Sequence, residues 1–224
     1  MTEYIRNPIL NNPPIPMDIV LGPAWWYKHE GITFDEDFFF HPAKRVEAER
    51  KMEQVLHKRW GRFGLGSDYD KDLPQVGAVH LAAGFLLSEM LGCRVEYKAD
   101  TPPQVIPAER TDFHLDPEDA FSSDAFHRFV RLTDSLKEKY GYLVGDVNWS
   151  GVLNLALDWR GSNLFMDFFD KGDEIREFFQ KISQVVERFV VGIENSPDSE
   201  AMNVNVAGPS SSLSKVPIKL SLIP

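Results

Sequence analysis

Apolar residues return at intervals of three and four positions over three stretches of the chain, and this spacing predicts amphipathic helices. The longest stretch runs from Asp173 to Glu194, and a second from Phe126 to Tyr140. The third follows His41-Pro42, where proline suits the first helical position because its ring already holds a helical φ and its missing N–H is not needed there. The face of the longest helix comprises Ile175, Phe178, Phe179, Ile182, Val185, Val186, Phe189, Val190 and Ile193.

Short apolar runs without that spacing lie between the helical stretches and predict buried strands. Val76–Leu81 begins as a strand and leads into a helix that Gly92 closes. Tyr142–Val147 reads as a strand buried on both faces. Strands that alternate with helices predict a parallel sheet with helical crossovers, so the expected fold class is α/β. Further strands are predicted at Arg94–Lys98 and Ala201–Val206, and further helices at Gly151–Trp159 and Asn163–Phe169.

Prolines and glycines divide the chain. Residues 1–16 hold four prolines and predict an extended arm, because proline and the residue before it both resist helix formation. Residues 61–75 read as a loop, and Pro102-Pro103 predicts a break.

Composition limits the classes of partner. Of the 224 residues, 43% are hydrophobic, which is enough for a sizeable core, and the formal net charge is −10. An acidic chain repels phosphate backbones and anionic lipid headgroups, so neither nucleic acid nor a membrane is an expected partner. The single cysteine, Cys93, excludes a disulfide framework. No leader-like segment or run of 18 apolar residues occurs, and the expected location is the cytoplasm.

Two segments carry a resemblance to a known family. The first is FLLSEMLGCRVEY at 85–97 followed by PPQVIP at 102–107, and the second is GDVNWSGVLNLALDWRG at 145–161 with the helix that continues to residue 194. Their order and spacing resemble the uroporphyrinogen decarboxylases and the related cobalamin (corrinoid) methyltransferases. The resemblance covers roughly residues 17 to 195.

The resemblance implies a (β/α)₈ TIM-type barrel, of which this chain would hold the N-terminal portion. The expected organisation is an extended arm at 1–16, a partial barrel with an N-terminal extension at 17–195, and a tail at 196–224 that adds one more strand. A typical barrel needs about 250 residues, so a truncated gene or a natural fragment is expected. An incomplete barrel also exposes a sheet edge, which predicts self-association or a partner chain at that edge.

The chain departs from the family at several functional positions. The family's two carboxylate-binding arginines would fall in Trp25–Gly31, which contains none. Its catalytic aspartate falls on or beside Ala83, and its tyrosine falls near Leu157. The methyltransferase branch uses zinc held by a His-x-Cys pair and a distant cysteine, so zinc would require ligands from outside this chain. No metal site and no catalytic residue is therefore assigned.

Substrate-binding candidates come from two parts of the chain. Asp146, Asn148 and Trp149 follow or end a predicted strand, where barrel enzymes contact substrate; the alternative is ordinary turn chemistry and loop packing. His80 lies in an apolar strand and is either a proton donor in a site or a hydrogen-bonded core histidine.

Trp25 and His29, beside Trp26, are candidates to cap a flat tetrapyrrole or corrin ring. The alternative is that this N-terminal segment packs against the rest of the fold.

The expected function is that of a uroporphyrinogen-decarboxylase-superfamily protein, closest to the methyltransferase-type branch, acting on a corrinoid or a small methyl donor. A porphyrinogen carboxy-lyase and a catalytically silent fragment or binding subunit stay open as alternatives, so enzymatic activity is undecided. The expected ligand is a tetrapyrrole, a corrinoid or another small molecule.

Overall fold

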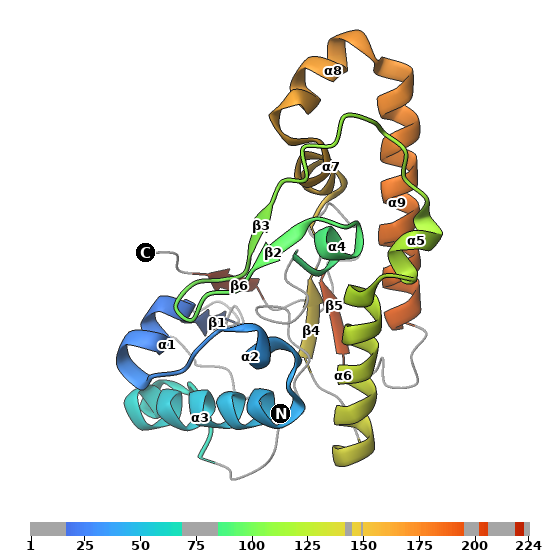
Figure 1. The fold of residues 1–224 in the computed structure, drawn as a ribbon. Helices are drawn as coiled ribbons and strands as arrows, with labels where there is room; N and C mark the ends of the chain where they lie inside the picture. Colours follow the sequence, from blue (N-terminus) through green and yellow to red (C-terminus); the bar gives the residue numbers. More distant parts are fainter. Residues whose placement is uncertain are drawn as a thin grey trace, which may run out of the picture.

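The protein is mainly helical. The computed structural model describes residues 17–68, 85–141, 145–148, 150–194, 202–205 and 218–221 (Figure 1). The helices are α1 (Pro23–Glu30), α2 (Glu36–Phe40), α3 (Pro42–Trp60), α4 (Phe85–Met90), α5 (Pro117–Phe121), α6 (Asp124–Tyr140), α7 (Val152–Arg160), α8 (Leu164–Asp170) and α9 (Gly172–Glu194), with 3₁₀ turns at Gly61–Phe63 and Gly161–Asn163. The strands are β1 (Met17–Val20), β2 (Arg94–Glu96), β3 (Gln104–Ile106), β4 (Gly145–Asn148), β5 (Met202–Asn205) and β6 (Ile218–Ser221).

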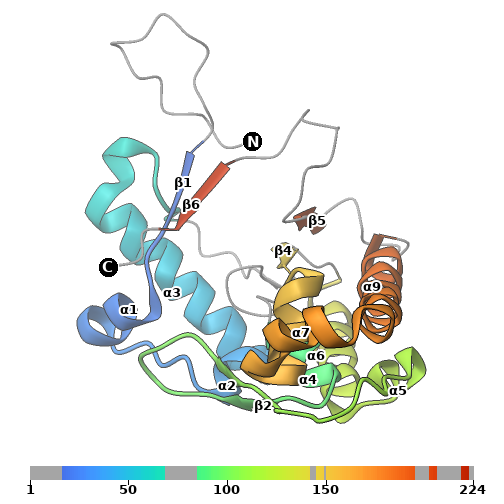
Figure 2. The ribbon, with the colours of Figure 1, turned by 90° about the horizontal axis from the view of Figure 1, so that it is seen from above.

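The predicted TIM-type barrel is wrong. Over the described residues the strands form three separate two-stranded sheets, with the pairs β1–β6 and β4–β5 parallel and β2–β3 antiparallel. Seen from above, β1–β6 and β4–β5 lie apart (Figure 2). A barrel requires each strand to bond to a neighbour on both sides, and none of these strands does.

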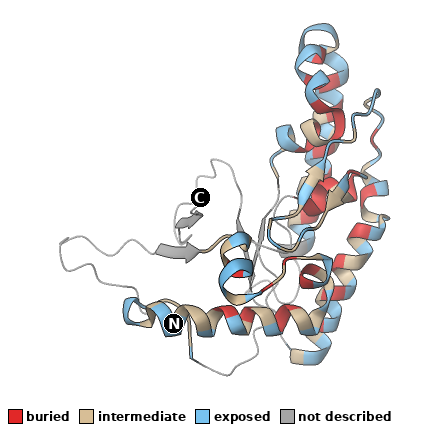
Figure 3. Ribbon diagram, turned by 60° about the vertical axis from the view of Figure 1, so that its left-hand side comes forward, coloured by how far each residue is buried: buried red, intermediate tan, exposed pale blue. Residues whose placement is uncertain are grey.

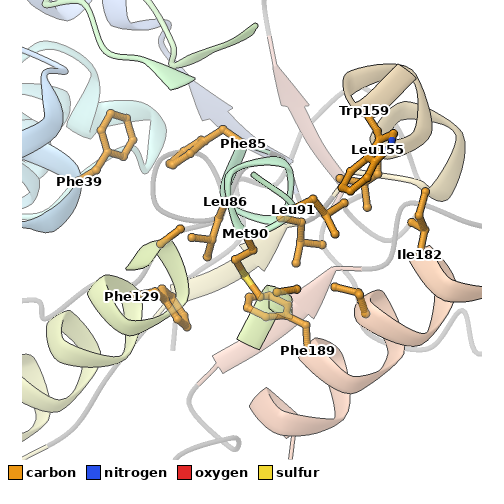
Figure 4. Close-up of a cluster of buried hydrophobic side chains, with 14 of the residues drawn as sticks. Phe39, Phe85, Leu86, Met90, Leu91, Phe129, Leu155, Trp159, Ile182 and Phe189 are labelled. Atoms are coloured by element: carbon orange, nitrogen blue, oxygen red, sulfur yellow. The ribbon is translucent and has the colours of Figure 1, made fainter. Parts of the chain in front are cut away.

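Helix packing replaces the expected sheet at the centre of the fold. The short helix α4 contributes Phe85, Leu86 and Met90 to the core, where they lie among side chains of α6, α7 and α9 (Figure 4). Phe129 of α6 and Phe189 of α9 meet there with ring centroids 5.8 Å apart. The apolar residues of α4 are thus used in helix–helix contacts. The strands predicted at 142–147 and 201–206 are present over Gly145–Asn148 (β4) and Met202–Asn205 (β5), which pair in parallel with each other and with no further strand that the structure describes.

Local sequence explains where several helices begin and end. The carboxylates of Asp35 and Asp116 and the hydroxyl of Ser123 accept hydrogen bonds from backbone N–H groups at the starts of α2, α5 and α6. Such caps satisfy donors that have no partner within the helix. Helix α6 ends at Gly141, whose φ of 78° is a left-handed conformation that glycine adopts without strain.

The helical predictions are largely confirmed. The helices after His41-Pro42, over Phe126–Tyr140 and over Asp173–Glu194 correspond to α3, α6 and α9, and α9 buries one face (Figure 3). The predicted strand at 94–98 is present as β2, but it pairs with β3 in an antiparallel ribbon. Helices α1 and α2 were not predicted, because each is too short to show a helical period.

Other predictions fall outside the described residues: the arm at 1–16 and the strand at 76–81. Among the described helices, none combines the length and the apolar character that crossing a bilayer requires.

Candidate functional site

The structure places the predicted site residues in two distant parts of the fold. Trp25 and His29 lie on α1, whereas Asp146 and Asn148 lie on β4, and both views of the ribbon show these elements well apart (Figures 1 and 2). In β4, Asp146 pairs in register with Asn203 of β5 and Asn148 with Asn205. The candidates therefore do not form one site.

His80 and Trp149 lie outside the described residues, as does Ala83, which the resemblance aligned with a catalytic aspartate. Leu157, aligned with the family's tyrosine, lies half-buried on α7 and packs against the core.

Helix α1 is held against the C-terminal part of α3 by aromatic contacts. The ring of Trp25 lies 4.8 Å from that of His29 and 5.8 Å from that of Trp60, measured between centroids. Trp26 is buried and meets Trp25 edge-on at 4.9 Å. The Arg59 guanidinium stands 5.1 Å from the centre of the Trp25 ring, a cation–π contact.

Polar contacts complete this junction. Arg59 Nη2 donates to Glu30 Oε1 at 2.6 Å, and Lys51 Nζ donates to the Glu30 carbonyl oxygen at 2.6 Å. Two cations of α3 thus contact the last turn of α1, where positive charge stabilises the negative end of the helix dipole.

The outer surface of this junction is basic and aromatic. We call it the α1–α3 corner. Its exposed cations Lys28 and Lys58 form no ion pair with any residue that the structure describes, and Arg62 lies 4.5 Å over the ring of Phe63. Positive charge is therefore concentrated here on a chain of net charge −10. The exposed members are Tyr27, Lys28, His29, Lys51, His57, Lys58, Arg59, Arg62 and Phe63.

Sequence reasoning found only Trp25, Trp26 and His29 of this corner. The cations of α3 were missed, although the segment HKRWGRF at 57–63 already places basic and aromatic residues side by side. Their role depends on α1 folding back over the end of α3, which no local pattern shows.

A second polar cluster joins α4 to α7. Ser88 Oγ donates to Asp158 Oδ2 at 2.6 Å, and Cys93 Sγ donates to the Asp158 carbonyl oxygen at 3.4 Å. Burial raises the pKa of the Asp158 carboxyl. Burial, together with the charge of Asp158, raises the pKa of Cys93 to about 12, so Cys93 stays a thiol and is a poor nucleophile or metal ligand.

A third cluster surrounds Arg128 of α6. Its Nη2 donates to both carboxylate oxygens of Glu89 at 2.7 Å, and its Nη1 donates to Glu36. Tyr97 donates to Glu89 as well, at 3.3 Å, and burial raises the pKa of its phenol. These contacts tie α2, α4, α6 and the residue after β2 together, with one guanidinium shared between two carboxylates.

Metal ligation has no candidate in the described part of the chain, where no three His, Cys, Asp or Glu side chains gather. No protein-family model, no curated protein and no solved structure matches this chain.

Proposed function

We propose that the chain binds a flat, anionic ring of the tetrapyrrole or corrin class at the α1–α3 corner. The sequence resemblance to uroporphyrinogen decarboxylases and corrinoid methyltransferases supplies the class of ligand. The observation that carries the proposal is the concentration of exposed cations around exposed aromatic rings on an otherwise acidic chain.

The corner offers two kinds of interaction to such a ligand. The exposed rings of Tyr27 and Phe63 present apolar faces for contact with a conjugated macrocycle. Lys28, Lys58 and Arg62 are available to ring carboxylates or phosphates. Each exposed ion pair contributes at most about 1 kcal/mol, so several must act together, and the local positive field raises the rate of encounter.

Trp25 and His29 hold the corner in shape under this proposal. Their rings and that of Trp60 pack α1 against α3, so the exposed cations of both helices are held in fixed relative positions. Methyl transfer or decarboxylation of the bound ring remains a further expectation from the resemblance, and zinc-dependent transfer would need ligands from another chain.

Absorbance titration of the purified chain tests the proposal. Coproporphyrin, a tetracarboxylate, is the anionic probe, and hydroxocobalamin, whose ring side chains are amides, is the corrinoid probe. Both rings shift their visible bands on binding. The Lys28→Glu/Lys58→Glu double variant should bind coproporphyrin about tenfold more weakly, equivalent to ~1.4 kcal/mol. Because both lysines are exposed, this variant should keep the wild-type fold.

Arg131→Glu/Lys139→Glu provides the matched control. Both residues are exposed on α6, away from the corner, and the variant reverses two charges without touching it. Binding of coproporphyrin that weakens at high salt, and weakens in the double variant much more than in the control, supports the proposal. No spectral shift with either probe, or equal losses in both variants, would overturn it.

A further inference from the structure

Helix α8 exposes an unusual amount of apolar surface. Phe169 is 84% exposed and Met166 is 63% exposed, and Phe165 and Phe168 are also exposed. Helix α8 forms the top of the molecule in Figure 1. Four large apolar side chains on one helix of seven residues form a contiguous patch of the kind that marks interaction sites.

The opposite side of α8 is firmly anchored, so the exposure is a fixed property of the fold. Leu164 is fully buried, and Asp167 accepts hydrogen bonds from Arg160 at 2.5 and 3.1 Å. Lys171, just past the helix end, lies 3.4 Å from the same carboxylate. Rotation of α8 to hide its phenylalanines would break this buried ion pair.

A groove of about 600 Å³ continues the patch along α9. Phe168 forms one wall and packs edge-on against Phe179 with ring centroids 5.9 Å apart. Ile175 lies at its base, and Gln180 and Gln184 line its polar side. Apart from Phe168, its lining residues all belong to α9, so the groove follows one face of α9 and meets α8 at Phe168. An apolar strip along a helix, bordered by polar side chains, has the form that accepts an amphipathic helix.

The border of this surface is acidic. Residues 164–187 contain six carboxylates and three cations. All three cations are already paired: Lys171 with Asp167, Arg176 with Asp173, and Lys181 with Glu177. By contrast Glu187, which lines the groove, and Asp170, in the last turn of α8, have no ion-pair partner among the residues that the structure describes.

We propose that the α8–α9 surface docks a cationic amphipathic helix of another polypeptide. The apolar face of that helix would cover Phe165, Phe168 and Phe169, and its lysines or arginines would pair with the free carboxylates. A second copy of this chain is a poor occupant, because a twofold interface would bring the same unpaired carboxylates together on two chains of net charge −10.

Fluorescence anisotropy with two designed peptides tests this assignment. Both peptides carry leucines at helical spacing; one has lysines on its polar positions and the other has glutamates. The full chain should bind the lysine peptide, and binding should weaken about tenfold or more in the Met166→Ser/Phe169→Ser variant, since central aromatic contacts dominate such interfaces. Both residues are exposed, so the substitutions remove no core contact.

Val191→Ser is the control, because Val191 is exposed near the far end of α9 and outside the groove. The proposal stands if only the lysine peptide binds and the control retains that binding. It fails if neither peptide binds, if the glutamate peptide binds equally well, or if the double variant binds like the wild type. A dimer in light scattering that the double variant abolishes would instead assign the surface to self-association and would also overturn the proposal.

Discussion

Arg45 in α3 and Arg160 in α7 are both buried against a phenylalanine ring, yet their surroundings differ. Arg160 donates from Nε and Nη2 to the two oxygens of Asp167, and from Nη1 to the Arg110 carbonyl oxygen. Arg45 lies 2.5 Å from Glu49 through Nη2, but its Nε and Nη1 have no hydrogen-bond partner in the part of the chain that the structure describes.

The difference is visible in the direction of the two pKa values. Hydrogen bonding to Asp167 raises the pKa of the Arg160 guanidinium. Burial lowers the pKa of Arg45, in spite of the opposing effect of Glu49 one turn along the helix. A bidentate partner offsets the loss of hydration, whereas a single contact does not. We therefore expect the Arg160–Asp167 pair to stabilise the fold at α7 and α8. We expect the Arg45–Glu49 pair, in contrast, to lower the stability of the α2–α3 region.

Arg160→Met should show the largest effect. It leaves Asp167 buried with only the more distant Lys171, and the free energy of unfolding should fall by about 3 kcal/mol. Urea denaturation at neutral pH measures the change. Arg176→Met, which removes an exposed pair with Asp173, is the control and should cost no more than about 0.5 kcal/mol. Equal losses in the two variants would show that Arg160 behaves as a surface residue.

Removal of both partners sharpens the comparison. Arg45→Met/Glu49→Leu should leave the free energy of unfolding unchanged or raise it by about 1 kcal/mol, because apolar groups need no hydrogen bonds. Arg160→Met/Asp167→Leu should still lower it by about 1 kcal/mol, because the Arg110 carbonyl loses its donor. Both double variants are compared by urea denaturation. The expected difference is contradicted if Arg45→Met/Glu49→Leu lowers the free energy of unfolding more than Arg160→Met/Asp167→Leu does.

The smallest expected effect is a difference in pH dependence between two carboxyls. The hydrogen bond from Arg160 lowers the pKa of Asp167 below its usual 3.8, so its stabilisation is present above pH 3.8 and is lost as the pH falls through the lower, folded value. Burial raises the pKa of Asp158 above 3.8, so its contribution is present at lower pH and is lost as the pH rises through the folded value.

Denaturation at several pH values separates these two carboxyls. Asp167→Asn should reduce the loss of stability in acid, and Asp158→Asn should reduce the loss between acid and neutral pH. Identical pH profiles for the two variants would contradict the opposite shifts.

In both the α1–α3 corner and the α8–α9 surface, some features follow from the local sequence and others depend on the tertiary structure. Trp25 and His29 were candidates from the sequence because aromatic residues cluster there, and their stacking follows from a four-residue separation on one helix. The contributions of Arg59 and Trp60 were not predictable, since they depend on α1 lying across the end of α3. For α8 the sequence predicted a helix over Asn163–Phe169, and only the structure placed its phenylalanines on the surface.

The sequence by itself determined the long helices and the acidic charge of the chain. The helical period of apolar residues acts over a few turns, so α3, α6 and α9 could be located in advance. Only the tertiary structure decided how the short apolar segments pair, because the same run of apolar residues can be buried by a sheet or by another helix. The alternation of short runs with helices favoured a parallel sheet, the family resemblance extended that expectation to a barrel, and the structure has helix-on-helix packing instead. The same ambiguity is why the exposed patch on α8 could not be seen in the sequence.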